Sequence, residues 1–266
     1  MIITPEQLSY TPSPTTHNVH QPKTMTAPRK SDLLSSPRRR PNDVCYLCGI
    51  RGDETPEGNL TRDHLPPLNL FPKTRRSNLI RVPCCYQCNN AAHNDDEYLR
   101  VAVSGQYNSN NIGKEVWKDK VVGSTLRKRR IRPAVNELSA SFKQIALITP
   151  QGVEDAIEGR MQAAPINRVL MRMTKGFLSL LYPEIDRGAL TFRISQLDIF
   201  KVNHPLFEQI RCQLRYFERG NGVYRCWYQG DTNYSWKGLW THMFFDSAWY
   251  LVEQTSDRKI EMPWRI

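Results

Sequence analysis

The chain has 266 residues, of which 39% are hydrophobic and 24% charged, and its formal net charge is +11 at pH 7. This length can fill the core of one large or two modest domains, which excludes a wholly disordered chain. No run approaches the roughly 18 uninterrupted apolar residues of a membrane span, and the first residues lack the basic-then-apolar order of a secretory signal. We expect a cytoplasmic protein with no membrane partner, and nucleic acid is the first partner to consider because excess positive charge attracts a polyanion.

The N-terminal segment, residues 1–42, is rich in Pro, Ser and Thr and ends in SPRRRP. Such a composition buries too little apolar surface to offset the entropy of ordering, so it predicts a disordered basic tail. Arg38, Arg39 and Arg40 would either grasp phosphate or serve as solvated charges of a linker.

Four of the seven cysteines form two Cys-x-x-Cys pairs, which are Cys45 with Cys48 and Cys85 with Cys88. In a reducing compartment this spacing favours a metal over a disulfide, and four thiolates close a tetrahedral zinc shell with no open position. Gly49 suits the tight turn of a zinc knuckle because it lacks Cβ. We therefore expect a structural Zn²⁺ whose binding supplies folding free energy, while the adjacent Cys84 packs away from the metal.

The segment between the cysteine pairs contains TRDHLPPLNLF, in which Asp63 and His64 precede two prolines. The prolines block a helix and hold the chain extended, so the pair is expected at the end of a strand. Asn78 is the second residue of SNLIRVP, in which an apolar strand leads into the second cysteine pair. Beyond that pair, Asn89 and His93 are four residues apart and would project from one face of a helix.

Over about residues 43–100 these motifs resemble the HNH endonucleases, also called ββα-metal or His-Me finger nucleases. The resemblance implies that His64 is the general base and that Asp63 and Asn89 hold a catalytic Mg²⁺ or Mn²⁺. Asn78 matches the central Asn that braces the loop holding the base. Asn89 stands where a His is usual, but an amide oxygen is an accepted ligand for Mg²⁺. His93 matches a further ligand of some relatives, or is simply a histidine on the face of a helix.

The activity implied by this resemblance is metal-dependent hydrolysis of phosphodiester bonds in DNA. A neutral imidazole with a pKa near 6.5 can take a proton from water at physiological pH, and a divalent ion can polarise the phosphate. A microbial anti-phage or restriction system, with a regulatory protein subunit, would be one setting for such an enzyme. The alternative is a non-catalytic zinc module that binds nucleic acid or protein and has no need of the Asp63–His64 pair.

Three acidic residues, Asp95, Asp96 and Glu97, follow His93. They would either support the ligands of the catalytic ion or form a solvated cluster that the helix dipole favours.

The expected fold class is α+β, with a zinc-stapled ββα-metal (HNH) domain at residues 43–105. Residues 106–139 form a basic connector, for which phosphate contact and simple solvation both stay open. Residues 140–266 form a mixed α+β domain that would select substrate or partner. Its segment APINRVLMRMTKGFLSLLYP predicts a helix with six apolar side chains on one face, namely Ile166, Val169, Leu170, Met173, Phe177 and Leu181. GVYRCWYQ and LWTHMFFDSAWYLVEQ favour strands.

Overall fold

The computed structural model describes residues 2–3, 43–126, 133–149, 152–183, 190–197, 205–230 and 235–259. Helices and antiparallel sheets are combined, which confirms the predicted α+β class. Arg38, Arg39 and Arg40 of the predicted tail lie outside the described residues, as do residues 127–132 of the connector. Within the predicted tail, strand β1 (Ile2–Ile3) pairs with β5 (Gly152–Glu158), which departs from the expected disorder. Two β-branched residues suit such an addition to a sheet.

The cysteine-bearing half, residues 43–105, is built on a two-stranded hairpin of β2 (Thr61–Leu65) and β3 (Ile80–Cys84). Two helices follow it directly, α1 (Tyr86–Ala91) and α2 (His93–Ser104). Because side chains alternate along a strand, one face of the hairpin is buried and the other is outward. Asp63 and Val82 pair on the buried face, whereas His64 and Arg81 pair on the outer face.

The predicted connector contributes to the core rather than only linking two domains. It contains α3 (Asn111–Val116), a π-helix over Trp117–Thr125 and α4 (Pro133–Ala140). Trp117 and Val121 are buried, and Nζ of Lys120 donates to the carbonyl oxygens of Asn69 and Phe71. The apolar residues among the charges explain this departure. No helix in the described part of the chain is both long and apolar enough to cross a membrane.

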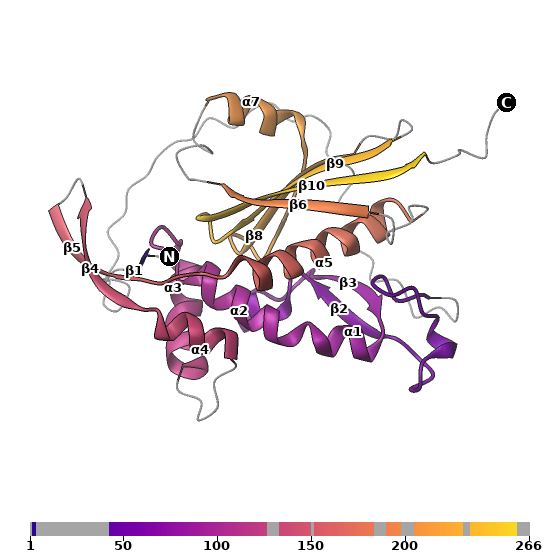
Figure 1. The fold of residues 1–266 in the computed structure, drawn as a ribbon, viewed down its shortest axis with the longest axis horizontal. Coiled ribbons are helices and arrows are strands. Elements are labelled where there is room, and N and C mark those ends of the chain that lie inside the picture. The colour runs from indigo at the N-terminus through magenta and orange to yellow at the C-terminus, as the bar shows by residue number, and fades with distance from the viewer. Residues whose placement is uncertain are drawn as a thin grey trace.

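A five-stranded antiparallel sheet forms most of the C-terminal half, in the order β6–β10–β9–β8–β7. Its strands are β6 (Leu190–Leu197), β7 (Arg215–Arg219), β8 (Tyr224–Gly230), β9 (Ser235–Phe244) and β10 (Ala248–Lys259). Helix α7 (Pro205–Gln213) lies over one face of this sheet (Figure 1). There Phe207 meets Trp249, which stacks on Trp227 with ring centroids 5.3 Å apart.

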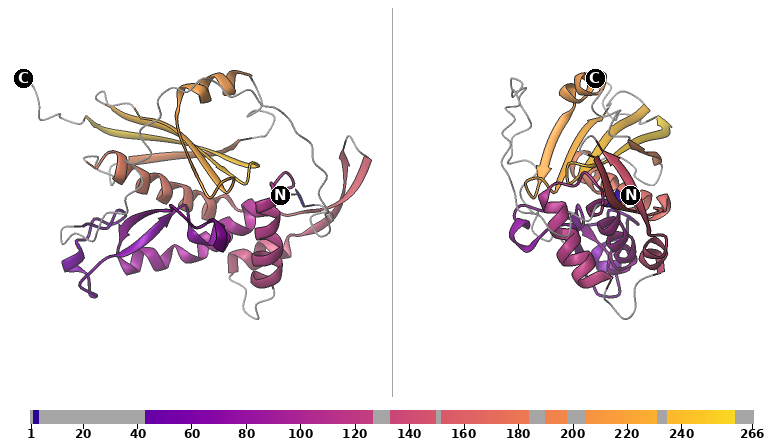
Figure 2. Two further views of the ribbon diagram at one scale, coloured as in Figure 1. Left: turned by 180° about the vertical axis from the view of Figure 1, so that it is seen from behind. Right: turned by 90° about the vertical axis from the view of Figure 1, so that its left-hand side faces the viewer.

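A ribbon of β4 (Lys143–Thr149) and β5 projects from the body of the molecule (Figures 1 and 2). Ile148 and Val153 pair near the end of this ribbon and are 85% and 73% exposed. A pocket of about 320 Å³ is lined by Ser141, Lys143, Glu158 and Arg160, none of which belongs to the β2–β3 hairpin.

Helix α5 (Ala163–Leu181) lies between the five-stranded sheet and the cysteine-bearing half (Figures 1 and 2). On the sheet side, Phe177 meets Phe217 and stacks on Trp240. On the hairpin side, Gly176 lies against Leu65 and Tyr46. One apolar core therefore runs through both halves, and the predicted apolar face is confirmed, with Leu181 at the helix end only partly buried.

A buried histidine joins α5 to the sheet. Nδ1 of His242 lies 2.7 Å from Oη of Tyr224, and its Nε2 lies 3.2 Å from Oγ1 of Thr174. Burial lowers the pKa of His242 to about 3, so this imidazole is neutral in the folded protein.

The contact between α5 and the hairpin can be tested with Gly176→Ala. A Cβ at this position would overlap Cδ1 of Leu65 and lie 3.2 Å from Cε2 of Tyr46. We expect the free energy of unfolding in urea to fall by about 1–3 kcal/mol. The control is Asn167→Ala, at a partly exposed position of the same helix, which should change stability by less than about 0.5 kcal/mol. Equal stability of the two variants would contradict the close packing.

Candidate metal centre and hairpin site

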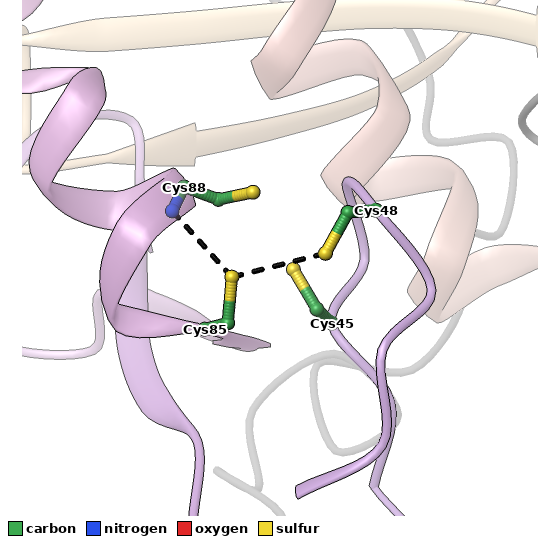
Figure 3. A group of neighbouring side chains, drawn as sticks. All are labelled: Cys45, Cys48, Cys85 and Cys88. Carbon is green, nitrogen blue, oxygen red and sulfur yellow. Dashed lines mark hydrogen bonds between the residues drawn. The ribbon is translucent and has the colours of Figure 1, made fainter. Parts of the chain in front are cut away.

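The four predicted zinc ligands come together in the fold. Cys45 and Cys48 lie on the loop before β2, Cys85 precedes α1 and Cys88 lies in its first turn (Figure 3). Their Sγ atoms all lie within 4.8 Å of one another, and those of Cys48 and Cys85 are 3.8 Å apart. Tetrahedral zinc with bonds of about 2.3 Å separates its sulfur ligands by about 3.8 Å. The four cysteines are therefore positioned to hold a metal ion and are compatible with structural zinc.

Local backbone geometry explains how the sequence builds this centre. Gly49 has a φ of +77°, a left-handed conformation that glycine adopts without strain, and its N–H donates to the carbonyl oxygen of Cys45 at 2.9 Å. Cys85 caps the N-terminus of α1, because its Sγ accepts a hydrogen bond from the backbone N–H of Cys88. The turn at Gly49 thus presents the thiols of Cys45 and Cys48, and the start of α1 presents those of Cys85 and Cys88.

The neighbouring thiols influence one another. Cys84 is fully buried in the core, and its thiol donates a hydrogen bond to Cys45, which lowers the pKa of Cys45. Burial raises the pKa of Cys48 and of Cys88. A metal ion would offset these costs by binding the deprotonated sulfurs, and protons would compete with it in acid.

Asp63 is held on the buried face of the hairpin. Its carboxylate is 5% exposed, accepts a hydrogen bond of 2.6 Å from Oη of Tyr46 and lies 3.6 Å from Nη1 of Arg172 in α5. Nη2 of Arg172 also pairs with Asp96 at the start of α2. Burial raises the pKa of Asp96, although Arg172 opposes this shift. Asp63 is thus part of a buried ion network that joins β2, α2 and α5.

The acidic residues of α2 are not a solvated cluster. Asp95 accepts two hydrogen bonds of 2.7 Å from Arg168, Asp96 pairs with Arg172, and Glu97 is buried beside Arg100. Arg168 and Arg172 are functional candidates that the sequence interpretation missed. Arg172 could have been noticed as a charge on the face of the helix that carries Val169, Met173 and Gly176.

His64 lies on the hairpin face opposite to Asp63. Its imidazole is partly exposed, faces Arg81 across the strand pair and makes no hydrogen bond to another described residue. Burial lowers its pKa, as do the positive charges of Arg81 and Arg76, while Asp63 partly opposes them. His64 is consequently neutral near pH 7 and free to accept a proton.

The three other predicted residues are placed differently. Asn89 lies on α1, and its Nδ2 donates to Oγ1 of Thr61 at 3.1 Å, on the hairpin face that carries Asp63. Asn78 is exposed in the turn before β3 with a φ of +59°, and its side chain contacts no described residue by a hydrogen bond. His93 is exposed at the start of α2, beyond an interruption at Ala92, and belongs to no potential metal cluster of the described residues.

The oxygens of Asp63 and Asn89 have the chemistry that Mg²⁺ or Mn²⁺ prefers. Arg172, however, already supplies a positive charge to both Asp63 and Asp96, and Tyr46 donates to Asp63. In this arrangement the residues do not fit a divalent ion. The roles of Asp63, Asn89 and His93 as its ligands stay predictions from the resemblance.

Zinc analysis tests the cysteine centre. We expect one zinc ion per chain by elemental analysis, and Cys88→Ser should lose it because a hydroxyl cannot replace the fourth thiolate. Structural zinc contributes on the order of 10 kcal/mol in small domains, so this variant should also melt at a markedly lower temperature. Cys212→Ser, which removes an exposed thiol of α7, should keep its zinc. Full zinc content in Cys88→Ser would refute the assignment.

A pH titration tests the electrostatics of the outer face. The pKa of His64 should lie below 6.5, and Arg81→Gln should raise it, because removing a nearby cation favours the imidazolium. The ring protons of His64 can be followed by NMR between pH 4 and 9. Arg62→Gln, on the same face but paired with Asp43, should shift this pKa less. A lower pKa in Arg81→Gln would contradict the arrangement.

Comparisons of the chain with protein-family models, with curated proteins and with solved structures return no significant match, so its chemistry is inferred from its own residues.

Proposed function

We propose that the protein is a nuclease of the HNH type that hydrolyses phosphodiester bonds in DNA at the outer face of the β2–β3 hairpin. The observation that carries this proposal is the state of His64. Its imidazole is partly exposed, has a lowered pKa and has no hydrogen-bond partner among the described residues. A neutral imidazole with a free ring nitrogen is what a general base requires.

In the proposed reaction, His64 takes a proton from a water molecule whose oxygen attacks the phosphorus. The new bond joins that oxygen to phosphorus, and the bond from phosphorus to the 3′ oxygen of the sugar breaks. The leaving oxygen takes a proton from solvent, which yields 3′-hydroxyl and 5′-phosphate ends. Arg81, directly across the strand pair from His64, is placed to attract the phosphate.

Two features of the fold support this proposal. The hairpin is followed directly by a helix, which is the order of elements in the nucleases that the sequence resembles. The cysteine centre ties the loop before β2 to the start of α1, so a bound metal would rigidify the unit that presents His64. The net charge of +11 would draw DNA towards it.

The second candidate is a zinc module that binds nucleic acid without cleaving it. The specific observation in its favour is Asp63, which is buried and paired with Arg172 on the face opposite to His64. Such a module would use the exposed Arg81 to contact phosphates. A role in a microbial anti-phage or restriction system, controlled by a partner protein, would suit either candidate and is part of the proposal.

A cleavage assay separates these candidates. Wild-type protein and His64→Ala are incubated with plasmid DNA and with RNA, with and without Mg²⁺ or Mn²⁺. We expect His64→Ala to cleave DNA about 100-fold more slowly or worse, because the general base is lost, while fluorescence anisotropy shows unchanged DNA binding. Asn167→Ala, a change at a partly exposed position of α5 that has no role in the proposed site, should retain cleavage.

Each outcome has a clear meaning. Full activity in His64→Ala would remove His64 from the mechanism. Binding of DNA by the zinc-loaded wild type without cleavage of any substrate would favour the binding module.

A further inference from the structure

We infer that the guanidinium of Arg172 takes the place of a divalent cation between Asp63 and Asp96, so that helix α5 keeps Mg²⁺ and Mn²⁺ out of the hairpin. This inference rests on the proposed function in one respect: exclusion of the ion would affect catalysis only if the hairpin is the nuclease site. The geometry itself stands without any nuclease activity.

The position of Arg172 is that of a cation enclosed by oxygens. The residue is 5% exposed, and its two terminal nitrogens approach carboxylates on separate elements, Asp63 in β2 and Asp96 in α2. These carboxylates come from the two elements that flank α1. Asn89 of α1 reaches the same hairpin face through Thr61, so a third oxygen-bearing side chain is nearby.

Arg172 makes fewer hydrogen bonds than its buried guanidinium could make. Its Nε and Nη1 are buried and make no hydrogen bond to any described residue, whereas buried polar atoms are ordinarily hydrogen-bonded. Nη1 lies 3.6 Å from Asp63, which is an ion-pair distance but too long for a hydrogen bond. Towards Asp63 the guanidinium therefore acts as a positive charge, whereas its Nη2 donates a hydrogen bond to Asp96. A small hard cation could provide the same charge.

The carboxylates need that charge. Without Arg172, Asp63 would keep only the hydrogen bond from the hydroxyl of Tyr46, and the largely buried Asp96 would lose its ion pair with Arg172. Buried carboxylates are strongly unfavourable without a cation. Carboxylate oxygens are ligands that Mg²⁺ and Mn²⁺ prefer. Removal of the arginine side chain should thus create a divalent-ion site.

The neighbouring Arg168 offers a matched control. It lies one turn earlier on α5 and pairs with Asp95, but its side chain is 56% exposed. Removal of the Arg168 side chain would leave Asp95 accessible to water, which would solvate the carboxylate without a bound ion.

The experiment uses the zinc-loaded full chain and Mn²⁺ as the probe. Binding is measured by calorimetric titration, and the melting temperature is measured with and without excess Mn²⁺. We expect wild type and Arg168→Met to show neither a binding site nor a shift. Arg172→Met should gain one Mn²⁺ site and melt about 5 °C higher in Mn²⁺, and the further change Asp63→Asn should abolish both effects.

Two results would overturn the inference. One is a Mn²⁺ site in the wild type that Asp63→Asn removes, because Arg172 would then not exclude the ion. The other is a folded Arg172→Met protein that binds no Mn²⁺. If this variant does not fold, Arg172→Gln is judged by the same criteria beside the wild-type measurement.

Neither readout depends on cleavage. A protein without nuclease activity can still gain the Mn²⁺ site in Arg172→Met, in which case only the proposed function fails. An active nuclease whose Arg172→Met variant binds no ion leaves the proposed function intact and removes only the role of Arg172.

Discussion

The rest of the structure depends on the burial of helix α5 from two sides. Phe177 and Thr174 of this helix contact the five-stranded sheet, while Gly176 and Arg172 contact the cysteine-bearing half. A helix that is apolar around most of its circumference is stable in water only when neighbours cover it. Neither half could keep its present core if α5 moved away, because each would expose the apolar surface that the helix now covers.

This arrangement makes the hairpin dependent on a distant part of the chain. The cysteine centre fixes the ends of the hairpin, but the charge that balances Asp63 comes from α5. Breaking such a buried pair by removing one partner is much more costly than breaking a surface pair. Two independent elements therefore act on the hairpin: the four-cysteine cluster at one end and an arginine from the other half of the molecule.

Features encoded by local pattern could be predicted from the sequence. The Cys-x-x-Cys spacing led to the four thiols that converge, and the 3.6-residue periodicity identified the apolar face of α5. The environment of Asp63 could not be predicted in this way, since local periodicity does not reveal which distant charge a buried residue will meet. For the same reason the acidic residues of α2 looked solvated, although Asp95 and Asp96 pair with arginines of α5. The placement of Asp63 and His64 on opposite faces follows from strand alternation once β2 is known.

The buried His242 gives the junction between α5 and the sheet a dependence on acidity. In the unfolded chain this imidazole would take up a proton near pH 6.5, whereas in the folded protein it stays neutral down to about pH 3. Between these limits acidification favours the unfolded state, because only that state binds the proton, and the bias grows by up to about 1.4 kcal/mol for each pH unit. Mild acid would accordingly destabilise the contact between α5 and the sheet, where Thr174 and Tyr224 enclose the ring of His242, rather than the charged surface.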